Sequence, residues 1–503
     1  MDFNQKDLDQ IAALGISTEE VEQQISRFKN GFPELKLFAP VEPGNGLKKL
    51  SPEELGAYID LFERQGVKNE LVKFVPASGA ASRMFKMLYN FLDGAISADD
   101  PDVQQFFNGL KNFAFYDELV EVLGADASLA IEARDKKVVE ALLTENGLNY
   151  GFLPKALLAF HKYEGGKVTK AIDEHLVEGA AYAADENGVV KLHFTVSAEH
   201  MDLIKAHIAK VKPVYEAEFD KTYEISYSVQ DKATDTLAVD LNNVPFRTES
   251  GELLFRPGGH GALLKNLDAI EGNIVFIKNV DNVAAQWLIK DTVDYKKALG
   301  GVLVDLQNKV FEYCNCFENI TEIGEELEQE ISVFLSEKLG YKLPDSFVKK
   351  TSEQKLELLF KVLNRPIRIC GVVESSGTGG GPFWVLSNDG TQTLQLVETA
   401  QVNLEKTDQV AILNASCYAN ITDLVCGVKN YKGEPFDLMQ FRDPDTGFIA
   451  EKSAGGKALK AMELPGLWNG AMSDWNTVFV EVPMTTFNPV KTVLDLLKKE
   501  HQG

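Results

Sequence analysis

A short apolar segment, a loop of small residues and an arginine follow one another at residues 71–83. Small residues let a backbone come close to a phosphate, and the backbone N–H groups that open a following helix face such an anion. A serine adds a hydroxyl donor, and an arginine adds a cation that can donate two parallel hydrogen bonds to one phosphate. The segment therefore predicts phosphate binding by the loop residues Ala77, Ser78, Gly79, Ala80 and Ser82, with Arg83 as a catalytic cation.

The same loop has a structural alternative, in which alanine and glycine are chosen only to pack a tight strand-to-helix turn. It is not a P-loop, because the Gly-Lys-Ser/Thr ending is missing. It is not the dinucleotide-binding fingerprint either, because only Gly79 stands at a glycine position of that motif. The loop alone thus leaves the packing interpretation open.

A lysine and an aspartate lie at two further positions that suit phosphate chemistry. Lys155 follows Pro154 ahead of an apolar run, and Asp281 follows the apolar segment 273–280. A carboxylate at a strand end is a usual magnesium ligand, because Mg²⁺ is held by one or two carboxylates plus substrate phosphate oxygens. The sequence therefore predicts Asp281 as a Mg²⁺ ligand. The alternatives are a surface lysine and an Asx turn.

Later segments combine glycine, aromatic and acidic residues. Gly259, His260 and Gly261 precede a helical pattern, which indicates either close backbone approach to a base or ribose or a capping turn. Glu398 follows a predicted strand and can hydrogen-bond sugar hydroxyls. The loop at 464–476 holds two tryptophans and an aspartate, which suits stacking on a carbohydrate ring. Core packing of those tryptophans is an equal alternative. Lys491 is interpreted as facing solvent.

Elements that alternate between strand and helix must position these residues. Hydrophobic patterns predict strands at 71–76, 191–197, 223–229, 273–280, 367–373 and 478–482, and helices over much of 1–70, 87–150 and 290–363. Thr18 and Ser51 each precede acidic residues and are predicted helix N-caps. The pattern predicts an α/β fold with a mostly parallel mixed sheet flanked by helices.

Composition limits the class of protein. With 503 residues, more than one substructure is expected. The net charge of −24 argues against nucleic acid and anionic membranes as partners. Five cysteines without zinc-type spacing predict reduced thiols. The sequence shows neither a signal peptide nor an apolar run near the roughly 20 residues that span a bilayer. A cytoplasmic protein is expected.

The order of these motifs resembles the sugar nucleotidyltransferase superfamily with a GT-A-like (Rossmann-like) fold, and within it the UDP-sugar pyrophosphorylase group. The loop through Met84 resembles the superfamily's first strand–helix turn, with Ala81 at a place often held by glycine or serine. Leu153-Pro154-Lys155 resembles its Pro-Lys segment, and Pro257–Gly261 resembles the group's nucleotide-binding Pro-x-Gly-His-Gly. The similarity spans about residues 71–495. The chain as a whole resembles most a bacterial family of about 500 residues.

The resemblance implies roles for individual residues. Lys155 would contact phosphate as a catalytic cation, Gln230 would lie near the base, and Asp474 would be a second metal ligand beside Asp281. Gly380 and Gly381 would lie near the sugar, because residues 377–385 resemble a group segment placed there. The implied nucleotide-binding set is Ala77, Ser78, Gly79, Ala80, Ser82, Gln230, Gly259, His260 and Gly261, and the implied sugar-binding set is Gly380, Gly381, Glu398, Trp468 and Asn469.

The resemblance also implies an organisation of the chain. Residues 1–70 would be a helical extension, and 71–300 the nucleotide-binding part of the core with a helical insertion at about 87–150. Residues 301–363 would be a second helical insertion, and 364–503 the sugar-phosphate side of the core.

The implied activity is Mg²⁺-dependent transfer of a nucleotide to a sugar 1-phosphate, which forms a nucleotide-sugar and pyrophosphate. The partners would be a nucleoside triphosphate and a sugar 1-phosphate, with uridine favoured only by the resemblance. Two alternatives stay open. One is a GT-A-type glycosyltransferase, whose Asp-x-Asp motif has the spacing of Asp443 and Asp445 in what is predicted to be a turn. The other is a sugar-nucleotide-binding protein without catalysis. Base, sugar and oligomeric state are left open by the sequence.

Overall fold

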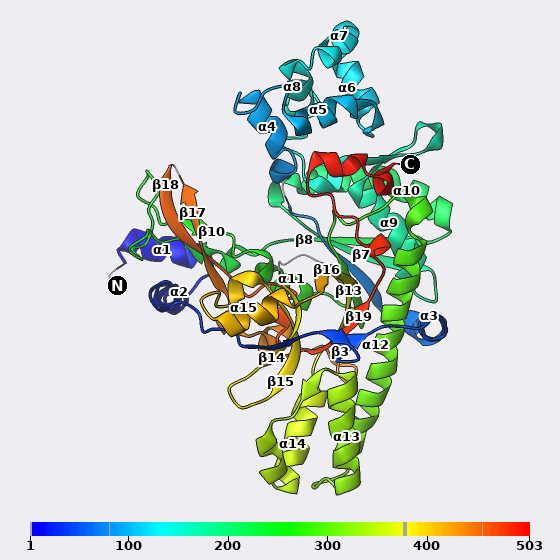
Figure 1. Cartoon of the computed structure of the whole chain (residues 1–503), viewed down its shortest axis with the longest axis vertical. Coiled ribbons are helices and arrows are strands. Elements are labelled where there is room, and N and C mark those ends of the chain that lie inside the picture. Colours follow the sequence, from blue (N-terminus) through cyan, green and yellow to red (C-terminus); the bar gives the residue numbers. More distant parts are fainter. Residues whose placement is uncertain (1–2, 80, 376–379, 455, 503) are drawn as a thin grey trace. The chain divides into compact units, whose positions relative to one another are not determined.

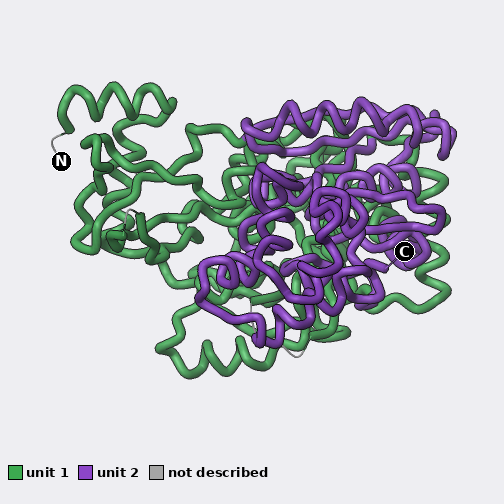
Figure 2. Tube along the Cα trace, turned by 90° about the horizontal axis from the view of Figure 1, so that it is seen from above, with its two compact units in different colours: residues 1–70, 230–275, 298–482 green, residues 71–229, 276–297, 483–503 purple. Residues whose placement is uncertain are grey.

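The computed structural model describes residues 3–79, 81–375, 380–454 and 456–502 and divides the chain into two compact units (Figures 1 and 2). Unit 1 comprises residues 1–70, 230–275 and 298–482. Unit 2 comprises residues 71–229, 276–297 and 483–503. Each unit is thus assembled from three separate stretches of chain.

Unit 1 contains a mixed sheet in which strands follow the order β2-β3-β19-β13-β16, parallel except for the antiparallel pair β13–β16. A second, antiparallel sheet has the order β1-β14-β15-β12. The strands of the first sheet are β2 (Glu42–Pro43), β3 (Gly46–Lys48), β13 (Ile367–Glu374), β16 (Tyr418–Gly427) and β19 (Asn476–Glu481). Those of the second are β1 (Leu37–Pro40), β12 (Tyr341–Lys342), β14 (Gly381–Leu386) and β15 (Gln392–Val397).

Helices and two small hairpins complete unit 1. The hairpins pair β9 (Thr236–Leu237) with β10 (Phe255–Arg256) and β17 (Phe448–Ala454) with β18 (Lys457–Glu463). The helices are α1 (Gln5–Ala13), α2 (Thr18–Asn30), α3 (Pro52–Gln65), α11 (Leu264–Asp268), α13 (Glu325–Lys338), α14 (Ser352–Leu363) and α15 (Thr407–Asn414), and α12 (Lys290–Phe317) begins in unit 2 and continues into unit 1.

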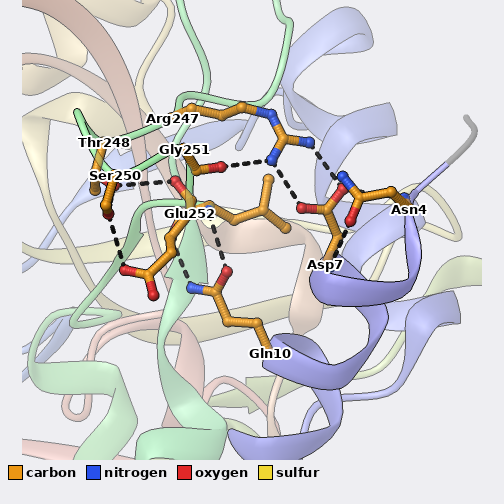
Figure 3. Close-up of polar contacts among 9 residues, drawn as sticks. Asn4, Asp7, Gln10, Arg247, Thr248, Ser250, Gly251 and Glu252 are labelled. Atoms are coloured by element: carbon orange, nitrogen blue, oxygen red, sulfur yellow. Dashed lines mark hydrogen bonds and ion pairs between the residues drawn. The ribbon is translucent and has the colours of Figure 1, made fainter.

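Helix α1 is held to the rest of unit 1 by a compact set of polar contacts (Figure 3). The Arg247 guanidinium donates to both carboxylate oxygens of Asp7, at 2.7 and 2.8 Å. Gln10 exchanges two hydrogen bonds with the backbone of Leu253, at 2.8 and 3.0 Å. The hydrogen bond from Arg247 lowers the pKa of the Asp7 carboxyl. The N-terminal helix is therefore an integral part of this unit.

Unit 2 is built around the parallel strands β4 (Leu71–Pro76), β7 (Val189–Val196) and β8 (Thr222–Val229). It also holds the pair β5 (Ala159–Lys162) and β6 (Val168–Lys170), and β11 (Ile274–Lys278) contains the boundary between the units. Its helices are α4 (Lys86–Leu92), α5 (Pro101–Asn108), α6 (Tyr116–Leu123), α7 (Ala127–Glu132), α8 (Lys136–Leu143), α9 (Ala171–Tyr182) and α10 (Met201–Phe219). A continuous apolar core joins these elements to Val280, Val490 and Leu496.

The predicted α/β class with a mostly parallel mixed sheet is confirmed, and the predicted strands are found within a few residues. The N-cap expected at Thr18 is wrong by one position. Ser17 caps α2, because its hydroxyl accepts from the Glu20 N–H at 3.1 Å while Thr18 is already helical. Ser51 caps α3 as expected, with Pro52 in the first turn.

All five cysteines are free thiols. Within the described ranges, no helix is long and apolar enough to cross a membrane.

Candidate functional site

The small-residue loop lies at the carboxyl end of β4 in unit 2. Ala77 is buried and bonds through its N–H to the Thr195 carbonyl at 2.8 Å, whereas Gly79, Ser82 and Arg83 are exposed. A methyl group built on Gly79 would meet no atom within 4 Å. The loop therefore presents an open backbone surface with a cation beside it. Ala80 lies outside the described residues.

The expected helix start directly after the loop is not found. Residues Ala81–Arg83 form a 3-10 turn, and α4 begins only at Lys86. The N–H groups of Met84 and Phe85 both donate to the Ala81 carbonyl, at 2.9 and 3.3 Å. Because these donors are used inside the turn, an anion at this loop would be met by the Arg83 side chain and the preceding loop rather than by a helix end.

Lys155 and Asp281 form an ion pair in unit 2. Lys155 Nζ lies 2.7 Å from Asp281 Oδ2 and donates to the Val490 carbonyl at 2.7 Å. The two side chains are only 13% and 11% exposed. Lys491 Nζ lies 3.8 Å from the same carboxylate oxygen, with a side chain that is 62% exposed. The predicted solvent exposure of Lys491 is observed, but its charge is also directed at Asp281.

Asp281 stands three residues after β11, and the chain near residue 490 runs back beside it. Val490 N–H donates to the Asp281 carbonyl at 3.0 Å, and Asn488 N–H donates to Asn282 Oδ1 at 2.8 Å. Lys155 N–H lies 3.4 Å from the Gly79 carbonyl. Together with the contacts of the Lys155 ammonium, these hydrogen bonds connect the loop, Lys155, Asp281 and the segment at 490.

Helix α9 supports this cluster with buried polar side chains. Glu178 accepts from Lys73 on β4 at 2.9 Å and from Lys278 on β11 at 2.7 Å. His175 Nε2 lies 3.1 Å from the carbonyl of Val280, the residue before Asp281. All of these side chains are buried. The helix thus fixes both strands whose ends carry the loop and the carboxylate.

A pocket of about 320 Å³ in unit 1 collects the five residues predicted for the sugar. Glu398 follows β15, and the two glycines lie at the start of β14. The lining residues are Gly380, Gly381, Leu396, Val397, Glu398, Ala419, Asn420, Thr422, Trp468 and Asn469. A stacking face and several hydrogen-bonding groups in one small cavity suit a polyhydroxylated ring.

His260 extends this cluster, since its ring stacks on Trp468 with centroids 4.7 Å apart and planes 26° apart. Its Nε2 lies 3.5 Å from Glu398 Oε1. Burial lowers the pKa of His260 to about 4. Burial, and to a smaller extent the charge of Glu463, raises the pKa of Glu398. A neutral imidazole is expected, so we interpret the 3.5 Å contact as a loose polar contact and not as an ion pair.

The pocket backbone is tightly constrained. Thr422 adopts φ = +54°, which is unusual for a β-branched residue, beside a register shift between β13 and β16. A methyl group on Gly380 would lie 2.2 Å from the Val397 carbonyl, so only glycine fits there. Asn469 is buried, and its Oδ1 has no hydrogen-bond partner within the described part of the chain. Strained backbone and an unsatisfied acceptor are typical of binding sites.

Arg368 on β13 supports the pocket indirectly, through the loop that carries Trp468. This buried guanidinium donates from Nη1 to the Trp468 carbonyl at 2.5 Å and from Nε to Thr477 Oγ1 at 2.8 Å. Burial lowers its pKa. Its two hydrogen bonds attach the loop that carries Trp468 and Asn469 to the sheet.

The other predicted residues of unit 1 lie outside this pocket's lining. Gln230 is half-buried and donates to Thr234 Oγ1 at 3.4 Å. Gly261 packs closely, since a methyl group there would lie 2.0 Å from the Pro465 carbonyl. Gly259 adopts φ = +77°. Asp474 is 58% exposed and lies 3.9 Å from Arg365. Among the residues described, no three metal-binding side chains gather at one point.

Sequence reasoning missed Asn420, Thr422 and Arg368. The segment at 418–424 looks like an ordinary strand in the sequence, and nothing local marks its bulge. Arg368 alternates with apolar residues in a buried strand, which is the one available signal, because an unpaired arginine in such a strand needs a polar partner.

Comparison with solved structures finds UDP-sugar pyrophosphorylases, which cover most of the chain. UDP-glucose phosphorylase from Trypanosoma brucei is 14% identical, with a TM-score of 0.46, over 97% of this chain and 77% of that one. A variant of UDP-glucose pyrophosphorylase from Leishmania major is 13% identical, with a TM-score of 0.47, over 98% and 77%. Another variant, in complex with UDP-glucose, is 12% identical, with a TM-score of 0.43, over 98% and 77%.

At these identities and TM-scores, the likeness does not carry the activity of those enzymes to this chain. No curated protein matches the chain. One family model, described as "Domain of unknown function (DUF4301)", matches residues 4–502. That match includes both units and every predicted site residue, and the chain therefore belongs to the DUF4301 family.

Proposed function

We propose that this protein is a sugar-1-phosphate nucleotidyltransferase, which forms a nucleotide-sugar and pyrophosphate. The observation that carries the proposal is the pocket of about 320 Å³ lined by all five residues predicted for the sugar. These residues come from parts of the chain up to 89 positions apart, from 380 to 469.

The phosphate groups are assigned to unit 2. The open loop and the exposed Arg83 would hold the β- and γ-phosphates, and Lys155 and Lys491 would neutralise charge at the α-phosphate. The sugar ring is assigned to the unit 1 pocket, against Trp468 and Glu398. Each assignment rests on the geometry within its own unit.

The chemical step is an in-line displacement. An oxygen of the sugar phosphate forms a bond to the α-phosphorus, and the bond from that phosphorus to the bridging oxygen of pyrophosphate breaks. The attacking oxygen is already anionic, so no general base is needed. Positioning and charge neutralisation by the lysines and Arg83 therefore provide the catalysis.

Asp281 fits a role in holding Mg²⁺ as a carboxylate shortly after a strand end, and the ion would replace the contact of its Oδ2 with Lys155. A single carboxylate together with substrate phosphate oxygens is a usual magnesium environment. The bound ion would supply charge neutralisation of the phosphates. The resemblance implies Asp474 as a second metal ligand, but we do not include it in the proposed metal site, because its side chain is mostly exposed beside Arg365.

The localisation and the remaining partners are part of the proposal. We place the protein in the cytoplasm, supported by five free thiols. The net charge of −24 supports small-molecule partners over nucleic acid or membrane.

Pyrophosphate release tests the proposal. The purified chain is incubated with Mg²⁺ and a matrix of nucleoside triphosphates and sugar 1-phosphates, and release is expected only for particular pairs. Asp281→Asn and Lys155→Met should each lower turnover on the order of 100-fold or more. Lys167→Met, which removes an exposed lysine paired with Glu218 at 3.1 Å, is the matched control. Binding of nucleotide without any release would favour the non-catalytic alternative.

A further inference from the structure

The C-terminal strap, defined as residues 488–501, forms hydrogen bonds with several residues around the candidate phosphate site of unit 2. Val490 contacts both Lys155 and Asp281, as described above. Val493 N–H donates to the carbonyl of Met84, next to Arg83, at 3.1 Å. Ala285 N–H donates to the Glu500 carbonyl at 2.9 Å. The strap, shown in red in Figure 1, thus connects three regions that are far apart in the sequence.

The strap is ordered internally by Asp495. Its Oδ2 accepts from the N–H groups of Lys491 and Thr492, at 2.8 and 2.7 Å. Val493 and Leu496 are buried in the apolar core of unit 2. The direction of Lys491 is therefore set by how the strap as a whole is seated.

A buried chain of polar groups anchors the far end of the strap. His501 Nδ1 lies 3.0 Å from His161 Nε2, and His161 Nδ1 lies 2.8 Å from Glu174 Oε1. The Glu174 carboxylate also accepts from the hydroxyls of Thr169 and Tyr163, at 2.6 and 2.9 Å. The two histidine rings are stacked, with centroids 5.3 Å apart. All three members are at most 2% exposed.

His501 also reaches back to the part of the strap that carries the site. Burial lowers its pKa to about 3. Asn488 and His501 line the same surface pocket. The imidazole thus contacts helix α9 through His161 and Glu174 and lies at the same pocket as Asn488, two positions before Val490.

We propose that His501 is a positioning residue for the phosphate site. It latches the strap so that the Val490 carbonyl holds Lys155 and the Lys491 ammonium faces Asp281. The inference rests on the proposed function for its catalytic consequence, whereas the latch itself can be measured without substrate. His501 touches no reacting group, and removing it acts through the position of Lys155 and Lys491.

The experiment compares His501→Ala, His501→Asn and His193→Ala with the unchanged protein. The asparagine amide stands close to the position of the imidazole Nδ1 and restores a partner for His161. His193 is a buried histidine of unit 2 that bonds to Ser226 and Ser228 and not to the strap, so it controls for loss of a buried imidazole. The substrate-free readout is amide hydrogen exchange at Val490 and Val493.

Exchange at these two amides should rise at least about tenfold in His501→Ala, rise less in His501→Asn and stay unchanged in His193→Ala. Turnover should fall roughly 10- to 100-fold in His501→Ala, since displacements near 1 Å have such effects. Unchanged exchange in His501→Ala overturns the latch. Faster exchange with unchanged turnover, in a protein that Asp281→Asn inactivates, overturns its catalytic role. If the unchanged protein shows no turnover, the proposed function fails, and exchange alone decides the latch.

Discussion

Replacing Glu178 with glutamine should destabilise the protein far more than replacing an exposed glutamate. Glu178 accepts from Lys73, Lys278 and the hydroxyl of Tyr182, at 2.9, 2.7 and 3.0 Å. Both lysine side chains are at most 2% exposed. Glutamine removes the negative charge that both lysines share, and its NH2 group takes the place of one carboxylate oxygen, so that an N–H donor faces one of the two ammonium groups. Breaking a buried ion pair by removing one partner costs about 3–5 kcal/mol.

The cost should also depend on pH, with a sign set by Lys73. Burial lowers the pKa of Lys73 from 10.5 to about 7 in the folded protein, and the Glu178 charge acts against that shift. Between pH 7 and 10.5 the unfolded chain therefore holds more protons than the folded protein, and stability rises with pH in that window. Without Glu178 the folded-state pKa of Lys73 falls further. Between that lower pKa and pH 7, the stability of the variant therefore rises with pH while that of the unchanged protein does not, so the difference between them becomes smaller.

The free energy of unfolding, measured by urea titration at about pH 6 and about pH 8.5, tests this reasoning. The difference between Glu178→Gln and the unchanged protein should be about 3–5 kcal/mol at the lower pH and smaller at the higher pH. Glu218→Gln breaks an exposed pair with Lys167 and should cost at most about 1 kcal/mol. Equal costs in the two variants, or a difference that grows with pH, would refute the argument.

Three further outcomes are expected. Gly79→Ala should leave the melting temperature unchanged, because the added methyl group meets open space. It should raise the KM for the nucleotide roughly tenfold, because the methyl group blocks the approach of a phosphate to the loop. An unchanged KM in steady-state assays would contradict this. Trp468→Leu should raise the KM for the sugar phosphate about 2- to 10-fold through loss of its stacking face, while the KM for the nucleotide serves as the internal comparison. Stability should fall as pH drops from 6.5 toward 4, since burial lowers the pKa values of His193 and His260 to about 4 and the unfolded chain takes up protons first; a flat urea midpoint over that range would refute it.

The fold was predictable where one short segment determines its own structure. The apolar run before Ala77 is found as β4, and the run before Glu374 as β13, because buried strands show continuous apolar sequence. The register shift at Thr422 was not predictable, since it arises from how β16 pairs with β13 and leaves no local pattern.

Individual residues of the candidate site could be proposed from the sequence, but their arrangement could not be predicted. Small, charged or aromatic residues near strand ends were the signals that led to the proposed roles of Glu398, Trp468, Lys155 and Asp281. The contact between Lys155 and Asp281 joins positions 126 apart, and the contact between Lys155 and Val490 joins positions 335 apart. Hydrophobic periodicity reflects only residues a few positions apart, so it cannot predict these contacts or the role of the strap.

Unit 2 is assembled from separate segments of the chain, and this affects how the protein folds during synthesis. Its segments 71–229 and 276–297 leave the ribosome well before residues 483–503, with 185 residues of unit 1 between them. At roughly 5–20 residues per second, that interval lasts about 10 to 40 s. Throughout it, the core positions filled by Val490, Val493 and Leu496 stand open, and the polar groups of His161 and Lys155 lack their partners. Nascent unit 2 is therefore expected to expose apolar surface, and to be prone to aggregation, until its last segment is synthesised.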